Sequence, residues 1–282
     1  MKKYDRAGDL AGKTKIELGD VQRTLLLPLW GRAVESQKPH PRLVDDKAVE
    51  IINEIDYDFS KIAENINPVT QYCWVARSLH TDRIISGFIK SHPSASIVNI
   101  GCGLDTTFTR IDNGQITYYN LDLPDVIALR KKFFSGSDRE KMIAGSFLDD
   151  NWMSRIESNR GVIIIAAGVY YYFTEEKIKS FFHSVAEHFT ASVLFFDIAS
   201  PLGVKVSNKR VLKASGMNGS AVLKWGISSG KEIKKWDRRI RLREEFPMFE
   251  GMKSGFPLRM KCALWVSDFL KIMSMVYLKI NP

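Results

Sequence analysis

Apolar and polar positions first follow a helical period along this chain and later alternate between strand-like and helical segments. In residues 48–55 and 75–88, apolar side chains recur at spacings of three and four, which is typical of amphipathic helices. The pattern predicts helices over residues 21–36, 45–55 and 68–90. Because these helices precede the first strand-like run, we expect a helical cap or extension over residues 1–90.

From residue 97 onward, short β-branched and aromatic runs alternate with helical patterns. Residues 162–167 (VIIIAA) are apolar at every position, which is typical of a central strand in a parallel sheet. The expected strands are 97–101, 116–121, 141–145, 161–167 and 192–198, and the expected helices between them are 105–111, 124–134, 150–157 and 174–189. This alternation predicts an α/β doubly wound sheet that binds its ligand at the carboxyl ends of the strands.

Beyond residue 200 the pattern is weaker. Glycine and serine punctuate residues 203–230, which we interpret as a lid insertion, and a helix is expected to begin at Ser228 or Ser229. Apolar residues from 266 to 273 share one helical face. Residues 275–280 fit either a helix or a final antiparallel strand.

A glycine-rich turn follows the first expected strand. Gly101 and Gly103 allow a tight turn and a close approach of the backbone to a ligand, and the next strand ends in Asp122, about 20 residues downstream. An acid at this distance is typical of a site for a ribose diol. The position that carries a third glycine or alanine in dinucleotide-binding turns is Thr106, so the turn favours a nucleoside over a dinucleotide.

Composition narrows the class of protein. With 282 residues, of which 45% are hydrophobic and 26% charged, the chain predicts one globular domain with an appendage. The three cysteines and five histidines form neither a disulfide framework nor a metal spacing, so we expect no metal site. No uncharged run approaches the length of a membrane span, and we expect a cytoplasmic protein without a membrane partner.

The net charge of +9 is concentrated in one segment. Residues 205–243 carry a net charge of +10, which leaves −1 for the rest of the chain. Such a segment could attract an acidic substrate, a nucleic acid or an anionic surface, although a solvated lysine-rich face is the more ordinary interpretation.

Residues 97–111 (IVNIGCGLDTTFTRI) resemble the glycine-loop signature of the leucine carboxyl methyltransferase family, which includes polyketide O-methyltransferases and protein phosphatase methyltransferases. Further segments agree in order, and the resemblance covers about residues 20–200. These segments are Arg32 to Ser36 with Asp45 and Ala48, Ala76 to Ser78 with Asp82, Asn120 to Pro124, Asp149 to Trp152, and Gly168 to Tyr172.

The resemblance implies a class I methyltransferase fold over residues 91–282, with a last antiparallel strand, and S-adenosylmethionine as the methyl donor. By position, Arg77 would contact the donor carboxylate and Asp122 the ribose hydroxyls. The other residues that the resemblance places around the donor are Arg32, Gly101, Gly103, Asp105, Leu123, Ser146, Phe147 and Ala167. The chain departs from the family pattern at Thr107, Ser146 and Ala167, where Arg, Asp and Glu are usual.

We therefore expect an O-methyltransferase that acts on a carboxylate or hydroxyl of a small, acidic, polyketide-like metabolite. Tyr171 and Tyr172 follow the fourth expected strand, where they would orient the acceptor, although tyrosines at this position also fit simple packing. An RNA-directed methyltransferase is an alternative because of the basic segment, but no aromatic-interleaved nucleic-acid motif accompanies it. A methyltransferase-like binding protein without turnover is a second alternative.

Overall fold

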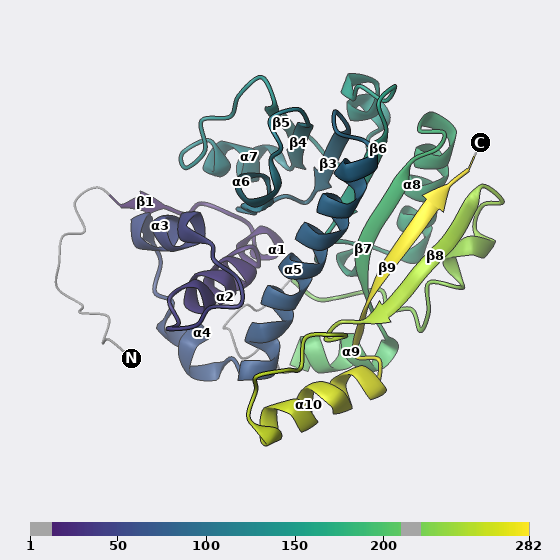
Figure 1. The fold of residues 1–282 in the computed structure, drawn as a ribbon. Coiled ribbons are helices and arrows are strands. Elements are labelled where there is room, and N and C mark those ends of the chain that lie inside the picture. Colours follow the sequence, from purple (N-terminus) through teal and green to yellow (C-terminus); the bar gives the residue numbers. More distant parts are fainter. Residues whose placement is uncertain (1–12, 210–220, 282) are drawn as a thin grey trace.

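A seven-stranded sheet forms the centre of the computed structural model, which describes residues 13–209 and 221–281 (Figure 1). Its strands are, in spatial order, β5 (Glu140–Ala144), β4 (Thr117–Asp122), β3 (Ser96–Ile100), β6 (Val162–Ala166), β7 (Val193–Ala199), β9 (Met273–Ile280) and β8 (Ile240–Pro247). The first five pair in parallel, and β9 is antiparallel to both β7 and β8. The prediction of a mostly parallel doubly wound sheet with an antiparallel last strand is confirmed.

Helices and short turns connect and cover these strands. The α-helices are α1 (Asp20–Arg23), α2 (Leu26–Ser36), α3 (Asp46–Glu54), α4 (Ser60–Asn65), α5 (Pro68–Ser91), α6 (Thr107–Ile111), α7 (Pro124–Arg130), α8 (Glu175–His188), α9 (Pro201–Ser207) and α10 (Leu258–Phe269). The 3-10 turns are η1 (Asp150–Arg155), η2 (Tyr170–Tyr172) and η4 (Ile233–Lys235), and a two-residue pair joins β1 (Thr14–Lys15) to β2 (Ile55–Asp56).

The two faces of the sheet are buried by different helices. In β6, Ile163 and Ile165 belong to the core formed with α5, whereas Ile164 belongs to the core formed with α8. Successive side chains of a strand point to opposite faces, so a strand that is covered on both sides needs apolar residues at every position. The continuous apolar run in residues 162–167 therefore reflects the central place of β6.

The N-terminal helices form a third core beside the sheet. Residues of α2 and α3 pack with Val126 and Leu129 of α7 and with Leu104, which follows β3. The helix α5 begins in this layer and runs onto the face of the sheet (Figure 1). The expected cap over residues 1–90 thus contains both a separate helical cluster and one of the sheet's own covering helices, while residues 1–12 lie outside the described part.

The C-terminal region differs from the sequence-based expectation in two places. The helix expected from Ser228 or Ser229 is wrong, because the Ser229 hydroxyl donates a hydrogen bond to Glu245 of β8 at 2.6 Å and only the turn η4 follows. Strand β8 was not predicted from the sequence. It is an edge strand with Arg241, Arg243 and Glu244 at its surface, and charged side chains on an edge strand hide the usual alternation.

Of the two alternatives for residues 275–280, the structure shows the antiparallel strand β9. The apolar face expected over residues 266–273 is only partly helical, because α10 ends at Phe269 and β9 begins at Met273. Part of the expected lid, residues 210–220, lies outside the described residues. After it, the backbone N–H groups of Lys224 and Trp225 donate to the Tyr171 carbonyl at 2.7 and 3.2 Å, so the chain returns directly over η2.

Candidate functional site

A cavity of about 810 Å³ opens at the carboxyl ends of β3, β4 and β6. The strand order reverses at β3, because β4 lies on one side of it and β6 on the other. Such switch points are where open α/β sheets bind ligands. All the residues that the sequence singled out for the site line this cavity: Arg32, Arg77, Gly101, Gly103, Asp105, Asp122, Leu123, Ser146, Phe147, Ala167, Tyr171 and Tyr172.

The turn after β3 requires glycine at two positions. Gly101 has a φ of 61° and Gly103 a φ of 47°, in the left-handed region that side chains disfavour. A Cβ at residue 101 would lie 2.6 Å from Cγ2 of Val169, and a Cβ at residue 103 would lie 3.1 Å from Cβ of Leu25. The turn therefore approaches both the exit of β6 and the N-terminal layer closely.

The carboxylate of Asp122 joins this turn to the end of β4. Its Oδ2 accepts a hydrogen bond from the Gly103 N–H at 2.7 Å, and its Oδ1 accepts one from the Leu123 N–H at 2.8 Å. Burial raises the pKa of Asp122 to about 6, although these two hydrogen bonds oppose the shift. The side chain can still accept further bonds, because each carboxylate oxygen has two lone pairs.

Arg130, at the end of α7, holds the same turn from behind and was not identified from the sequence. It is 1% exposed, and its Nη1 donates to the carbonyls of Gly103 at 3.1 Å and Asp105 at 2.7 Å. Its Nη2 donates to Oε1 of Glu140 in β5 at 3.1 Å. No sequence signal marks Arg130 as a support of the turn, because its bonds to the turn go to backbone carbonyls more than 20 residues away.

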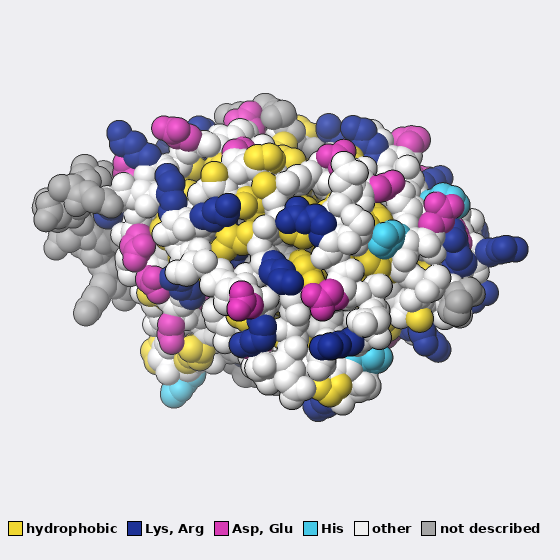
Figure 2. All heavy atoms as spheres, turned by 90° about the horizontal axis from the view of Figure 1, so that it is seen from above, with side chains coloured by type: hydrophobic (Ala, Val, Ile, Leu, Met, Phe, Trp, Pro, Cys, Tyr) yellow, Lys and Arg dark blue, Asp and Glu magenta, His cyan; other side chains and the backbone are white. Residues whose placement is uncertain are grey.

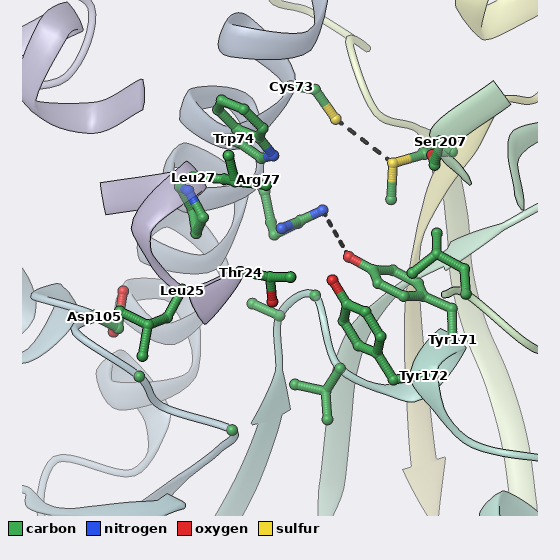
Figure 3. Close-up of a pocket in the computed structure, with 18 of the residues that line it drawn as sticks. Thr24, Leu25, Leu27, Cys73, Trp74, Arg77, Asp105, Tyr171, Tyr172 and Ser207 are labelled. Atoms are coloured by element: carbon green, nitrogen blue, oxygen red, sulfur yellow. Dashed lines mark hydrogen bonds between the residues drawn. The ribbon is translucent and has the colours of Figure 1, made fainter. Parts of the chain in front are cut away.

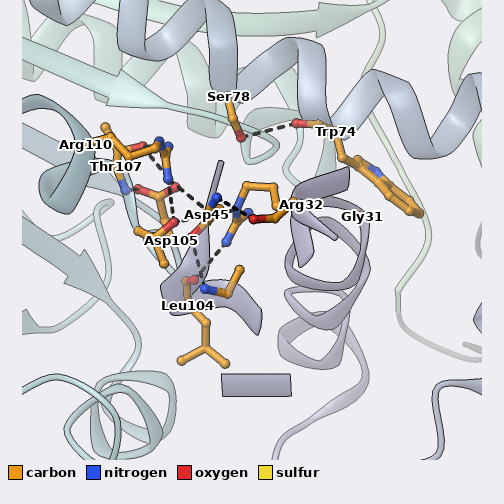
Figure 4. Close-up of polar contacts among 12 residues, drawn as sticks. Gly31, Arg32, Asp45, Trp74, Ser78, Leu104, Asp105, Thr107 and Arg110 are labelled. Atoms are coloured by element: carbon orange, nitrogen blue, oxygen red, sulfur yellow. Dashed lines mark hydrogen bonds and ion pairs between the residues drawn. The ribbon is translucent and has the colours of Figure 1, made fainter. Parts of the chain in front are cut away.

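Arg32 holds the turn from the N-terminal layer (Figure 4). Its Nη2 donates to the Leu104 carbonyl at 3.0 Å, and its Nε donates to Oδ2 of Asp45 at 2.8 Å. Asp45 also accepts from Thr106 and Arg110. Burial alone would raise the pKa of Asp45, but Arg32, Arg110 and the hydrogen bonds from Thr106 and the Ala48 N–H together lower it. The hydrogen bonds of the Arg32 guanidinium thus go to Asp45 and Leu104 of the protein itself. Arg32 also lines the cavity in which the sequence placed the methyl donor.

Asp105 is bound mainly by neighbouring side chains and backbone. Its Oδ2 accepts from Nδ2 of Asn99 at 3.0 Å and from the Thr107 N–H at 3.1 Å. Thr107 stands where the family usually has arginine. Arg110 brings a guanidinium to this place, and its Nη2 donates to Oγ1 of Thr107 at 3.1 Å.

Arg77 reaches into the cavity from α5 and meets Tyr171 (Figure 3). Its Nη2 lies 2.9 Å from Oδ2 of the fully buried Asp197 in β7 and donates to the Tyr171 hydroxyl at 3.2 Å. Burial raises the pKa of the Tyr171 and Tyr172 hydroxyls, so both remain protonated near neutral pH. The two rings lie on the opposite side of Arg77 from Asp105 and Leu25 (Figure 3).

Two apolar ends extend the cavity from this polar centre. At one end, Leu123, Ser146 and Phe147 follow β4 and β5, and the buried Phe147 ring packs edge-on against Phe173 and Phe181. The other end is lined by Cys73 of α5 and by residues from α9, α10 and β9 with neighbouring loops: Leu202, Leu223, Phe249, Val266, Leu270, Ile272 and Met273. Ala167, at the exit of β6, also lines the cavity.

The basic segment does not form one continuous patch in the described residues. Lys205 and Lys209 line the cavity at the end formed by α9, α10 and β9. In contrast, Arg239 precedes the edge strand β8 and pairs with Asp237 at 2.6 Å.

Comparison with known proteins agrees with this architecture. The sequence model of the leucine carboxyl methyltransferase family matches residues 26–186. The tetracenomycin polyketide synthesis O-methyltransferase TcmP of Streptomyces glaucescens is 29% identical over 84% of this chain and 86% of its own length. An S-adenosylmethionine-dependent methyltransferase of Gibberella zeae, dpfgK, is 24% identical over 66% of this chain and 67% of its own.

Among solved structures, a DUF574 family protein from Streptomyces avermitilis shares the fold with a TM-score of 0.54 at 11% identity, over 90% of this chain and 97% of that one. The family match covers more than half of the chain and includes α2, α5, the glycine turn and Asp122. The chain therefore belongs to the leucine carboxyl methyltransferase family and is a methyltransferase that uses S-adenosylmethionine as its methyl donor.

Proposed function

We propose that this enzyme methylates the carboxylate of a small, largely apolar acceptor and so forms a methyl ester. The observation that carries the proposal is the set of ionisable groups around the cavity. Among the described lining residues there is no histidine, and the carboxyl groups are those of Asp105 and Asp122. Asp122 accepts from the glycine turn and Asp105 from the Thr107 N–H, and Asp105 lies away from Tyr171 and Tyr172 (Figure 3).

The remaining lining groups are poor bases. Burial raises the pKa of the Cys73 thiol to about 11 and also raises the pKa of the two tyrosine hydroxyls. An alcohol acceptor would need a base to remove its proton during transfer, whereas a carboxylate is already ionised at neutral pH. The sequence allowed either a carboxylate or a hydroxyl as the acceptor group. The lack of a suitable base among the described lining residues favours the carboxylate.

The cavity walls fit the methyl donor on independent grounds. The turn at Gly101 has no room for a side chain, Asp122 offers acceptor lone pairs for a ribose diol, and Arg77 offers a cation for the methionyl carboxylate. Leu123, Ser146 and Phe147 would hold the adenine. Ala167 provides no acid where the family usually has Glu.

When bound, S-adenosylmethionine supplies a methyl group on a positively charged sulfur. The chain then has to hold the acceptor oxygen in line with that methyl group and keep water away, which can lower the barrier without a catalytic acid or base. The Tyr171 hydroxyl accepts from Arg77, so its own proton is free to bind one oxygen of the acceptor carboxylate. Lys205 and Lys209 would attract the anion at the mouth.

The proposal is tested by whether the product is a methyl ester, which mild alkali hydrolyses, or a methyl ether, which resists alkali. The enzyme is incubated with methyl-labelled donor and three matched acceptors: 1-hydroxy-2-naphthoic acid, 2-naphthoic acid and 1-naphthol. We expect label in both acids, released as volatile methanol by mild alkali, and a rate that is flat between about pH 7 and 9 because the carboxyl group is fully ionised. Label in the naphthol that resists alkali would contradict the proposal.

Tyr171→Phe provides a matched variant, since the ring remains and the hydroxyl is removed. We expect about a tenfold loss in kcat/KM for the acids, as for one lost hydrogen bond to a charged group, with little change in donor affinity.

A further inference from the structure

The outer side of α10, together with Leu202 of α9, exposes a cluster of large apolar side chains. Leu258 is 76% exposed, Trp265 59% and Phe269 70%, and the rings of Trp265 and Phe269 stack with their centroids 5.2 Å apart. Leu202, Val266 and Leu270 complete the cluster, which we call the α9–α10 face. The inner side of α10 buries Leu264, so the helix is attached by one side and its two aromatic residues face solvent. The helix itself lies at the edge of the molecule (Figure 1).

This face is continuous with the mouth of the cavity. Leu202, Val266 and Leu270 are 45–47% exposed and also line the cavity. Residues that belong to both surfaces form the rim between them. An apolar molecule on the α9–α10 face therefore lies next to the end of the cavity that Leu202, Val266 and Leu270 line, with Lys205 and Lys209 at the same mouth.

Exposed cations lie on the same two helices and directly after them. Lys205 and Lys209 line the cavity mouth, and Arg259, Lys261 and Lys271 lie in or directly after α10. The acidic residue of α10, Asp268, is buried and paired with Lys253, and α9 has no acidic residue. The face seen from above in Figure 2 is different, because there Lys and Arg are interleaved with Asp and Glu.

The positive charge on α9 and α10 indicates which kind of partner can bind the α9–α10 face. A second copy related by a twofold axis would place these cations against the same cations, which is unfavourable. An anionic surface would match them. Exposed Trp, Phe and Leu side chains beside Lys and Arg are the combination by which helices lie in the interface of an anionic bilayer.

We propose that the α9–α10 face docks on the surface of an anionic lipid bilayer, from which an apolar acceptor passes into the cavity. The docking stands on the surface alone, and the transfer of the acceptor rests on the proposed function. The sequence led us to expect no membrane partner, and none of the helices in the described part of the chain could span a bilayer. The contact proposed here is confined to the lipid surface.

The test measures binding of the full chain to vesicles without donor or acceptor, so its result is independent of methyl transfer. Sedimentation is compared for vesicles of phosphatidylcholine alone and vesicles with about 30% phosphatidylserine. We expect binding to the anionic vesicles that weakens with added salt, and a loss of about tenfold or more in the double variant Trp265→Ser, Phe269→Ser. Val44→Ser removes an exposed apolar residue elsewhere, 56% exposed, and should bind as the wild type does.

Several outcomes would overturn the proposal. The proposal is wrong if the protein binds neither type of vesicle. It is also wrong if the wild type and the double variant bind the anionic vesicles equally well. Self-association in light scattering that the double variant abolishes would assign the face to a second copy instead. An unchanged affinity for S-adenosylhomocysteine in the double variant shows that the donor site is intact and that the fold is preserved.

Discussion

At the scale of single residues, Asp122 has a protonation state that should affect both folding and ligand binding. Burial raises its pKa to about 6 from an ordinary value of 3.8. A carboxyl group whose pKa is higher in the folded state contributes stability that is fully present below about pH 4 and is lost as the pH rises through about 6. Donor binding depends on pH in the opposite sense, because only the ionised form accepts hydrogen bonds from both ribose hydroxyls and both backbone N–H groups.

We predict that the affinity for S-adenosylhomocysteine falls as the pH is lowered below about 6, approaching a tenfold loss per pH unit. Isothermal titration between pH 5 and 8 measures this dependence. Asp122→Asn is the matched control, since it keeps the size of the side chain, and it should bind more weakly at pH 8 with a flatter pH profile. A wild-type affinity that follows the same profile as the variant would exclude the role of Asp122.

At the scale of elements, α7 and β5 are joined to the glycine turn by one buried ion pair. Arg130 binds Glu140 and two carbonyls of the turn, while Arg32 binds the carbonyl between them. The carbonyls of the three consecutive residues 103–105 thus accept hydrogen bonds from the guanidinium groups of Arg130 and Arg32, and these bonds hold the turn in one conformation. The donor site therefore depends on elements that do not themselves contact the donor.

Arg130→Met should destabilise the protein by about 3–5 kcal/mol, because it removes the Arg130 donor from the carbonyls of Gly103 and Asp105 and leaves the Glu140 carboxylate buried without its cation. Urea unfolding measures the change. Arg139→Met is the control, since Arg139 pairs with Asp112 at the surface, and its unfolding midpoint should match that of the wild type. Equal stability of the two variants would show that the buried pair has no special role.

At the scale of the whole molecule, the N-terminal layer and the sheet share one cavity. Arg77 and Leu25 approach it from the helices, and Gly101, Gly103 and Asp122 approach it from the sheet. A ligand in this cavity contacts both parts and should stabilise them together, since binding to the folded state alone shifts the folding equilibrium.

Hydrogen exchange measured by mass spectrometry should therefore show protection by S-adenosylhomocysteine in two distant regions. We expect slower exchange in residues 20–36 and 68–91 as well as in residues 101–105 and 145–147. Residues 231–247, which contain η4 and β8, serve as the internal control and should exchange at an unchanged rate. Protection confined to the sheet would show that the N-terminal layer takes no part in donor binding.

The sequence by itself determined the succession of the five parallel strands along the chain, the turn at Gly101 and Gly103, and the family. These features follow from local patterns: apolar runs set by burial on both faces, glycines set by a left-handed backbone, and a motif read along consecutive residues. It also placed Asp122 at the end of its strand, because the distance from the turn is fixed by one helix and one strand.

Only the tertiary structure decided how the site is supported. The Arg32 guanidinium meets a carbonyl 72 residues away, and Arg77 meets Tyr171 94 residues away. It also showed the role of Arg130, which sequence reasoning had missed, and the edge strand β8. Long-range hydrogen bonds leave no period in the sequence, because a buried guanidinium needs only an oxygen at the right place, whatever residue supplies it.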